Sequence, residues 1–147
     1  MQPAPWSSLW ILVVVLMVVV GIALVIGYNI YAVRHVRLEV SPEGLRIKGG
    51  LYGRSIALSS LVMTEAKVIT LAQEPRLCPK IRTNGIGLHG YGQGWFTLQD
   101  DSKALLFMAM NERALYIPTT EGYVLLLTPG YPEGVLHTLN EIKKSNK

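Results

Sequence analysis

The sequence predicts a mainly β protein with one N-terminal transmembrane α-helix, followed by an antiparallel barrel of about seven or eight strands that a C-terminal helix closes. Three observations support this fold class. Residues 1–33 contain no Asp, Glu, Lys or Arg. Beyond Arg37, apolar and polar residues alternate in short runs separated by Gly, Pro and Asp, which is typical of strands and turns. From Pro132 onward the apolar residues recur at helical spacing.

Residues 9–33 form the expected transmembrane helix. The run is almost wholly apolar, and about 20 helical residues at about 1.5 Å each cross the roughly 30 Å of hydrocarbon in a bilayer. Backbone groups in lipid must be paired within the segment, so a helix is expected despite the many valines. Trp6 and Trp10 lie at one end of the run and Tyr28 and Tyr31 at the other, where aromatic rings mark the membrane interfaces.

The flanks of this segment predict a retained anchor and its orientation. A cleaved signal peptide has a basic start and an apolar core of about 7–15 residues, whereas residues 1–8 have no basic side chain and the apolar run is longer. The juxtamembrane segment 34–37 is basic. By the positive-inside rule, we expect a single-pass protein of the cell membrane, with residues 1–8 outside and a domain at 38–147 in the cytoplasm.

Ala23 and Gly27 form a small-xxx-small pair within the predicted helix. Such pairs let two transmembrane helices approach closely, so a homo-oligomer is one interpretation. The other interpretation, which is favoured, is that small residues are simply common in membrane helices.

Composition argues against several classes of function. Beyond Arg37 the chain has 12 of its 14 basic side chains and all 10 acidic ones, and this net charge of +2 is too small to indicate nucleic-acid binding. Cys78 is the only cysteine, so an intramolecular disulfide is excluded and a cysteine-based zinc site is not expected. No metal-ligand spacing is present, and we expect no cofactor.

Short strands separated by turns are expected throughout the domain. The sequences SPEG at 41–44 and DDS at 100–102 are typical of turns, and the glycine pair at 49–50 makes a two-residue hairpin plausible. The strands expected from alternation are residues 38–40, 45–48, 51–58, 62–71, 94–99, 104–108, 114–117 and 123–127.

Residues 132–144 are expected to form an amphipathic helix. Pro132 suits the first turn of a helix, and apolar residues then recur at i, i+1, i+4 and i+7. These residues are Val135, Leu136, Leu139 and Ile142. The helix is expected to cover the open end of the barrel.

Five segments resemble those of a known family. The strings GLRI at 44–47, RSIAL at 54–58 and GWF at 94–96, the strand at 123–129 and the helix that Pro132 begins are similar to those of bacterial pleckstrin-homology (PH) domain proteins. The resemblance extends over about residues 38–142, and its motifs are structural rather than catalytic. It implies a PH-like barrel, a binding role and, in many members, transmembrane helices just before the domain.

A glycine-rich stretch matches a nucleotide-binding pattern by letter only. Residues 85–90 read G-x-G-x-x-G, but a dinucleotide site needs a helix N-terminus directly after the glycines, and a strand is expected there instead. We therefore expect residues 75–94 to be a long exposed loop. It carries Arg76, Lys80 and Arg82, so it is interpreted either as a solvated loop, which is favoured, or as a contact for an anionic partner.

The family resemblance also implies a ligand-contact region. In PH domains that bind phosphoinositides, basic residues near the first hairpin contact the headgroup, and this sequence has Arg46, Lys48 and Arg54 around residues 49–50. Arg46 and Lys48 share one strand face because they are two residues apart. A strict two-residue turn pairs Leu45 with Arg54 and places Arg54 on the apolar side. Either a bulge changes this register or Arg54 lies at the barrel mouth; a merely solvated strand face is the alternative to lipid contact.

No catalytic centre is indicated. His35, His89 and His137 lie in three different segments, and none stands in a local arrangement typical of nucleophilic catalysis. We therefore expect a membrane-tethered, non-catalytic interaction module without a cofactor. A protein partner is favoured because the charge is modest. The alternatives are an anionic-lipid-binding domain and a structural or assembly subunit of a membrane complex.

Overall fold

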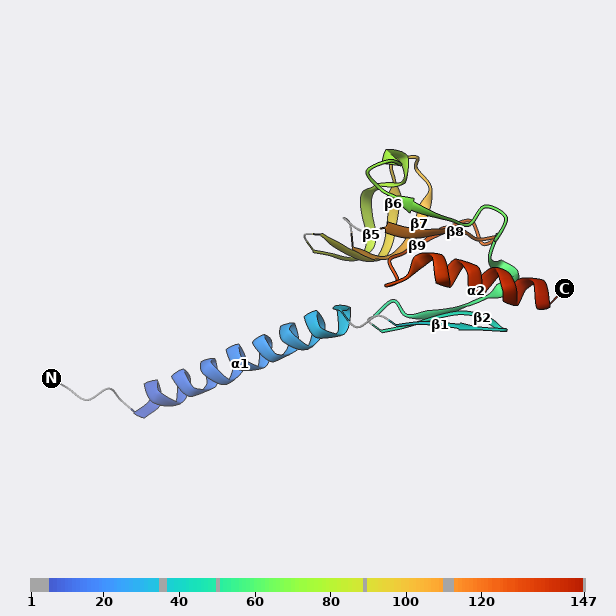
Figure 1. Ribbon diagram of the computed structural model, residues 1–147. Coiled ribbons are helices and arrows are strands. Elements are labelled where there is room, and N and C mark those ends of the chain that lie inside the picture. Colours follow the sequence, from blue (N-terminus) through green and yellow to red (C-terminus); the bar gives the residue numbers. More distant parts are fainter. Residues whose placement is uncertain (1–5, 35–36, 50, 89, 110–112, 147) are drawn as a thin grey trace. The chain divides into compact units, whose positions relative to one another are not determined.

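The N-terminal part of the chain is one long apolar helix. A computed structural model of the protein describes residues 6–34, 37–49, 51–88, 90–109 and 113–146, and the chain separates into two compact units, 1–35 and 36–147. The first unit contains α1 (Trp6–Arg34), a helix of 29 residues (Figure 1). Its segment Leu9–Tyr28 has a mean hydropathy of 3.4 over 20 residues, so it is long and apolar enough to cross a bilayer.

The second unit begins with a small antiparallel sheet of three strands, β1 (Arg37–Ser41), β2 (Gly44–Lys48) and β3 (Arg54–Ala57). Leu45, Ile47 and Ile56 are buried on one face. Gly44 is required between β1 and β2, because its φ is +148° and a Cβ there would lie 2.1 Å from the carbonyl oxygen of Ile56. The turn predicted at 41–44 is therefore confirmed.

The predicted two-residue hairpin after β2 is wrong. Ile47, not Leu45, pairs with Arg54, so the connection is longer than two residues and the strand expected at 51–58 begins only at Arg54. Gly53 allows the connection to return close to β2, since a Cβ on it would lie 2.9 Å from the carbonyl oxygen of Ile47. Alternation alone could not reveal this longer loop because its residues continue the apolar pattern of the strand.

A larger sheet of six strands follows in the described residues. The strands are β4 (Lys67–Thr70), β5 (Pro79–Leu88), β6 (Tyr91–Leu98), β7 (Lys103–Ala109), β8 (Arg113–Pro118) and β9 (Val124–Leu127). Their order across the sheet is β4-β8-β9-β7-β6-β5, and every neighbouring pair is antiparallel except β7 and β9, which are parallel. The described residues thus contain nine strands, and the strand expected at 62–71 is shortened to β4.

The long exposed loop expected at residues 75–94 is wrong. After a short 3₁₀ turn at Pro75–Leu77, its described residues form β5 and the start of β6. Glycine is usually unfavourable in a strand. Here the glycines allow the backbones of β5 and β6 to approach closely. A Cβ on Gly85 would lie 2.5 Å from the carbonyl oxygen of Gln93, and one on Gly94 would lie 2.6 Å from the Cα of Gly85. Gly90, with φ of +80°, completes the turn between the two strands.

Two apolar cores lie on the two faces of the large sheet. The first core, which includes Leu105, Leu115 and Leu125, is shared with the small sheet and with α2 (Pro132–Ser145). Leu139 of α2 is fully buried in it, and the helix packs against β1, β4 and β8, as Figure 1 shows. The second core, around Phe96 and Leu106, lies on the opposite face. The mainly β fold with a C-terminal helix is therefore confirmed.

Candidate functional site

Trp95 lies at the centre of an aromatic and cationic cluster. Its ring meets that of Tyr123 edge to face, with centroids 5.0 Å apart and planes at 78°. The Lys103 Nζ atom lies 4.6 Å from the centroid of the Trp95 ring. The Arg54 guanidinium carbon lies 5.5 Å from the same centroid and 5.9 Å from that of Tyr123. We call these four residues the Trp95 cluster.

Strand pairing explains how residues from four segments meet at this cluster. Asn84, Trp95 and Leu105 form one row across β5, β6 and β7, so their side chains share the face of the first core. Arg54 pairs with Ile47, so it points to the apolar side of the small sheet while remaining exposed at the strand end. The sequence left open whether Arg54 lies on this side or a bulge changes its register, and the pairing places it on the apolar side.

A hydrogen bond joins the two sheets beside the cluster. The Tyr52 hydroxyl donates to Asn84 Oδ1 over 3.0 Å, and the Tyr52 ring lies over Gly94, whose lack of a side chain leaves room for it. The Tyr52 side chain is thereby held against β5 and β6 of the large sheet. These contacts fix the segment next to the Trp95 cluster to the large sheet.

Burial and charge act in opposite directions on Tyr123. Burial raises the pKa of its phenol above the usual value of 10.0, Glu121 raises it further and the Arg54 guanidinium lowers it. Neither Arg54 nor Lys103 forms an ion pair with a described carboxylate. The cluster therefore presents a half-buried indole, a buried phenol and two cations that form no ion pair with a described carboxylate.

Two other predicted site residues lie together on the exposed face of β2. Arg46 Nε donates to Ser55 Oγ over 3.1 Å, and Lys48 Nζ lies 2.8 Å from Glu39 Oε1. The hydrogen bond from Lys48 lowers the pKa of Glu39, and the charges of Lys48, Arg46 and Arg37 lower it further. This face, formed by β1 and β2, is a basic patch that also contains the carboxylate of Glu39.

The remaining predicted residues follow the chain into β5. Arg76 contacts Glu74 at 3.4 Å, and Lys80 contacts Asp101 at 2.7 Å. Arg82 is exposed on β5 and forms no ion pair within the described residues. The six predicted cations thus lie in separate places: two on β2, one in the Trp95 cluster and three from the 3₁₀ turn into β5.

Sequence reasoning missed Trp95, Lys103, Tyr123, Tyr52 and Asn84 as site residues. Trp95 was recognised only as part of a fold motif, and the other contacts join residues far apart in the chain. The parity of Arg54 on its strand was a usable signal, because it placed a cation on the apolar side, where an aromatic ring is a suitable neighbour. Which ring it meets depends on the packing of the two sheets.

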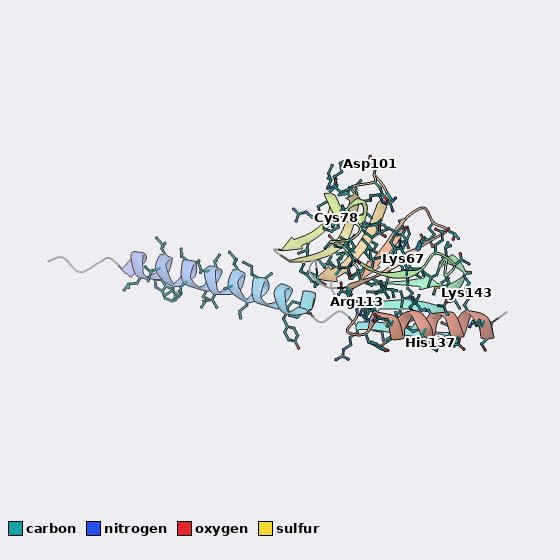
Figure 2. All side chains as sticks on the ribbon, turned by 45° about the horizontal axis from the view of Figure 1, so that its top comes forward. Lys67, Cys78, Asp101, Arg113, His137 and Lys143 are labelled. Atoms are coloured by element: carbon teal, nitrogen blue, oxygen red, sulfur yellow. The ribbon has the colours of Figure 1, made fainter. Side chains whose placement is uncertain are left out.

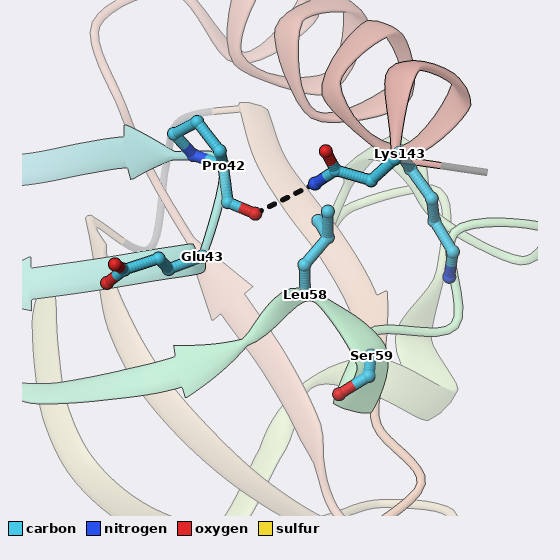
Figure 3. Close-up of a pocket in the computed structure, with 6 residues that line it drawn as sticks. Pro42, Glu43, Leu58, Ser59 and Lys143 are labelled. Atoms are coloured by element: carbon cyan, nitrogen blue, oxygen red, sulfur yellow. Dashed lines mark hydrogen bonds between the residues drawn. The ribbon is translucent and has the colours of Figure 1, made fainter.

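A hollow of about 370 Å³ beside the end of α2 is lined by residues that attach this helix to the rest of the domain (Figure 3). Asn146 Nδ2 donates to the carbonyl oxygen of Pro42 over 2.9 Å, and Lys143 Nζ donates to that of Leu61 over 2.7 Å. These bonds fasten the last turn of the helix to the β1–β2 turn and to the segment after β3. The hollow is therefore explained as part of the helix attachment.

The described residues offer no metal-binding group of three or more His, Cys, Asp or Glu side chains. Cys78 lies between the 3₁₀ turn and β5, and His137 lies on α2 (Figure 2). The Cys78 thiol, half-buried, contacts the carbonyl oxygen of Leu71 at 3.7 Å, whereas His137 is exposed on α2. His35 and His89 lie outside the described residues.

Comparison with known proteins agrees with this architecture. The family model described as "Bacterial PH domain" matches residues 36–142, which is most of the second unit. The chain belongs to the bacterial PH domain family. Neither the curated proteins nor the solved structures contain a match to it. Membership of this PH family indicates a non-catalytic interaction module.

Proposed function

We propose that this bacterial PH domain is held at the membrane by α1 and binds a protein partner through the Trp95 cluster. The observation that carries the proposal is the half-buried indole of Trp95 between two cations, Arg54 and Lys103, neither of which has a described carboxylate partner. Trp, Tyr and Arg are the residues in which binding energy concentrates at protein interfaces. Here all three side-chain types meet at one place on the domain.

Membrane attachment supports weak binding at this surface. The segment Leu9–Tyr28 is long enough to span a bilayer, and we propose the boundaries 9–33 for the span, 34–37 for the basic flank and 38–147 for a cytoplasmic domain. Confinement to a surface raises the effective concentration of any partner in the same membrane. Contacts that are weak in solution then suffice.

The anchor and its orientation are tested directly in native membranes. The full chain should stay in the membrane fraction after extraction at alkaline pH and keep its complete mass, because the helix is not cleaved. Protease added to inside-out vesicles should digest the domain, whereas protease added to intact cells should not. A shortened mature chain would show a cleaved signal, and digestion in intact cells would reverse the orientation.

The protein partner is tested by photo-crosslinking in the same membranes. A photoreactive residue replaces Leu51, which is 76% exposed and adjoins Tyr52; a second version carries it at the exposed Glu141 of α2 as a control. We expect protein adducts from position 51 that Arg54→Glu and Lys103→Glu reduce and Lys144→Glu leaves unchanged. Adducts only to lipid would reject a protein partner. Adducts of fixed stoichiometry from both positions would indicate an assembly subunit.

A second candidate function, contact with anionic lipid, rests on the basic patch of the small sheet. Arg37, Arg46 and Lys48 lie on its exposed face, and Arg37 follows the last residue of α1 by three positions in the sequence. Amide exchange in β2 should then slow in nanodiscs containing phosphatidylglycerol relative to pure phosphatidylcholine, and the double variant Arg46→Ala/Lys48→Ala should remove the difference. Equal exchange in both lipids would reject this function.

A further inference from the structure

Strand β5 is a long open edge of the large sheet. It has ten residues, and among the described strands it pairs only with β6. The side chains from Lys80 to Asn84 are all exposed, and Ile81, an apolar residue, is 56% exposed. A long, exposed edge strand with an uncovered apolar side chain is uncommon, because proteins usually shorten or cover such edges.

The backbone of β5 is suited to pairing with another strand. Register with β6 shifts near Pro79 and again between Arg82 and Asn84, but it is continuous over residues 84–88. In an antiparallel ladder every second residue directs its N–H and C=O groups away from its partner strand. Gly85 and Gly87 have no side chains to cover these groups, and no proline follows Pro79 in the strand. An incoming strand therefore meets accessible donors and acceptors.

Charge indicates what kind of segment fits this edge. Arg82 lies on β5 without a described carboxylate, on the sheet face of Phe96. An acidic segment would neutralise this cation, whereas a second copy of this chain would add an identical cationic edge. Charge complementarity therefore favours an acidic partner over self-association.

We propose that β5 accepts an extended acidic segment of the partner protein as a seventh strand of the large sheet. This inference rests on the proposed function, because it gives the protein partner a conformation and a charge. Main-chain hydrogen bonds to β5 provide the attachment, as in other cases of strand addition. Arg82 lies in the row of Phe96 and Ile81 in the row of Thr97, so these two side chains are on opposite faces of β5. Alternate residues of the added strand therefore place carboxylates beside Arg82 and apolar side chains beside Ile81.

The test uses the full-length chain in phosphatidylcholine nanodiscs and two labelled peptides. The first peptide has eight residues that alternate Val and Glu; the second has the same sequence with alternate backbone amides methylated, which blocks pairing along one edge without changing charge. Binding is measured by fluorescence anisotropy. We expect the first peptide to bind at least about tenfold more tightly than the second, because each 1.4 kcal/mol of lost hydrogen bonding corresponds to about tenfold in Kd.

Charge variants distinguish peptide binding at the β5 edge from non-specific electrostatic attraction to the domain. Arg82→Glu should weaken binding of the first peptide by about fivefold or more, whereas Lys144→Glu, which makes the same charge change on α2, should leave it unchanged. Amide exchange should show added protection in β5 when the first peptide is bound and none when the second is added. Urea unfolding of both variants checks that they are folded.

Several results would overturn the inference. Equal binding of the two peptides would show charge attraction without strand addition, and absence of binding at about millimolar peptide would show a closed edge. A dimer of the chain in sedimentation, disrupted by Arg82→Glu, would assign the edge to a second copy. If photo-crosslinks from position 51 persist while the peptide fails, the edge is wrong and the protein-binding function stands; if the crosslinks to protein are absent, that function fails.

Discussion

The two edges of the large sheet are treated in opposite ways. At one edge, β4 has only four residues, and α2 packs against it and against its neighbour β8. Lys67 of β4 pairs with Glu74 at 3.0 Å, and Arg113 of β8 pairs with Glu133 of α2. Lys67 and Arg113 are labelled in Figure 2. At the other edge, β5 has ten residues and leaves Arg82 and Ile81 exposed.

This difference lies in the length and the covering of the two edge strands. A short strand and a covering helix are common ways to prevent unwanted strand pairing, as are prolines, charges and bulges. Strand β4 has the first two, whereas β5 carries Pro79, the Lys80–Asp101 ion pair and two register shifts only in its first half, so residues 84–88 stay regular. A long, uncovered edge strand in the same sheet is most simply explained by a role in binding.

The largest expected effect comes from a substitution in the hairpin that β5 and β6 form. Gly94→Val should destabilise the domain by about 3 kcal/mol or more or prevent folding, because the residue has φ of +108° and its Cβ would lie 2.6 Å from the Cα of Gly85. Gly87→Ala on the same hairpin is the control. Its Cβ would be 3.7 Å from the nearest atom, so a change below about 1 kcal/mol in urea unfolding is expected. Similar losses for both would contradict the close approach.

The next effect tests a buried amide in the same hairpin. Gln93 is 0% exposed, and neither Nε2 nor Oε1 has a hydrogen-bond partner in the described part of the chain. Its neighbours across β5 and β7 are Ile86 and Phe107. Gln93→Met should therefore raise the unfolding free energy by about 1–3 kcal/mol, since burying an unpaired amide costs about that much. Gln93→Glu should lower it, and destabilisation by the Met variant would show an unrecognised partner.

A smaller effect concerns the protected edge. Hydrogen bonds from Lys67 and then Arg76 lower the pKa of Glu74 below 4.5. A carboxylate with a lowered pKa in the folded state contributes stability above its unfolded pKa, and this contribution is lost as the pH falls through the folded value. Below about pH 4.5 the wild type should lose stability slightly more steeply than Glu74→Gln. Parallel curves in thermal unfolding at different pH values would remove the ion pair as a stabiliser of this edge.

The smallest effect is confined to the Trp95 cluster. Burial raises the pKa of Tyr123 and Arg54 lowers it, so Arg54→Ala should raise that pKa further. Because the folded-state pKa is above the unfolded one, stability from the neutral phenol is complete below pH 10 and is lost as the pH rises through the folded value. NMR of the Tyr123 ring against pH measures the shift. A lower pKa in Arg54→Ala would show that the guanidinium is not near the phenol.

Much of the fold was predictable because its signals are local. The apolar run of α1, the turn before Gly44, the hairpin at 100–102 and the helix from Pro132 each follow from neighbouring residues. Strand β5 was not predictable, because glycine is usually a sign against a strand and here permits two backbones to approach. The parallel pairing of β7 and β9 and the extra length of the β2–β3 connection depend on contacts between distant segments.

The candidate site was predictable only in part for the same reason. The strand position of Arg54 indicated a cation on the apolar side of the small sheet. Its contact with Trp95 and Tyr123 could not be inferred, since it depends on how the two sheets cross. Lys48, Arg76 and Lys80 looked available in the sequence, but Glu39, Glu74 and Asp101 pair with them in the structure.

The position of β9 determines when the domain can form during synthesis. It is the last strand to leave the ribosome, yet it lies in the middle of the large sheet between β8 and β7. Until it emerges, β7 and β8 each have an unfilled inner edge, and the first core lacks Leu125 and Leu127 as well as Leu139 of α2. A nascent chain that stops after β8 therefore holds two partial sheets rather than a folded domain, so folding is expected late and as one cooperative event.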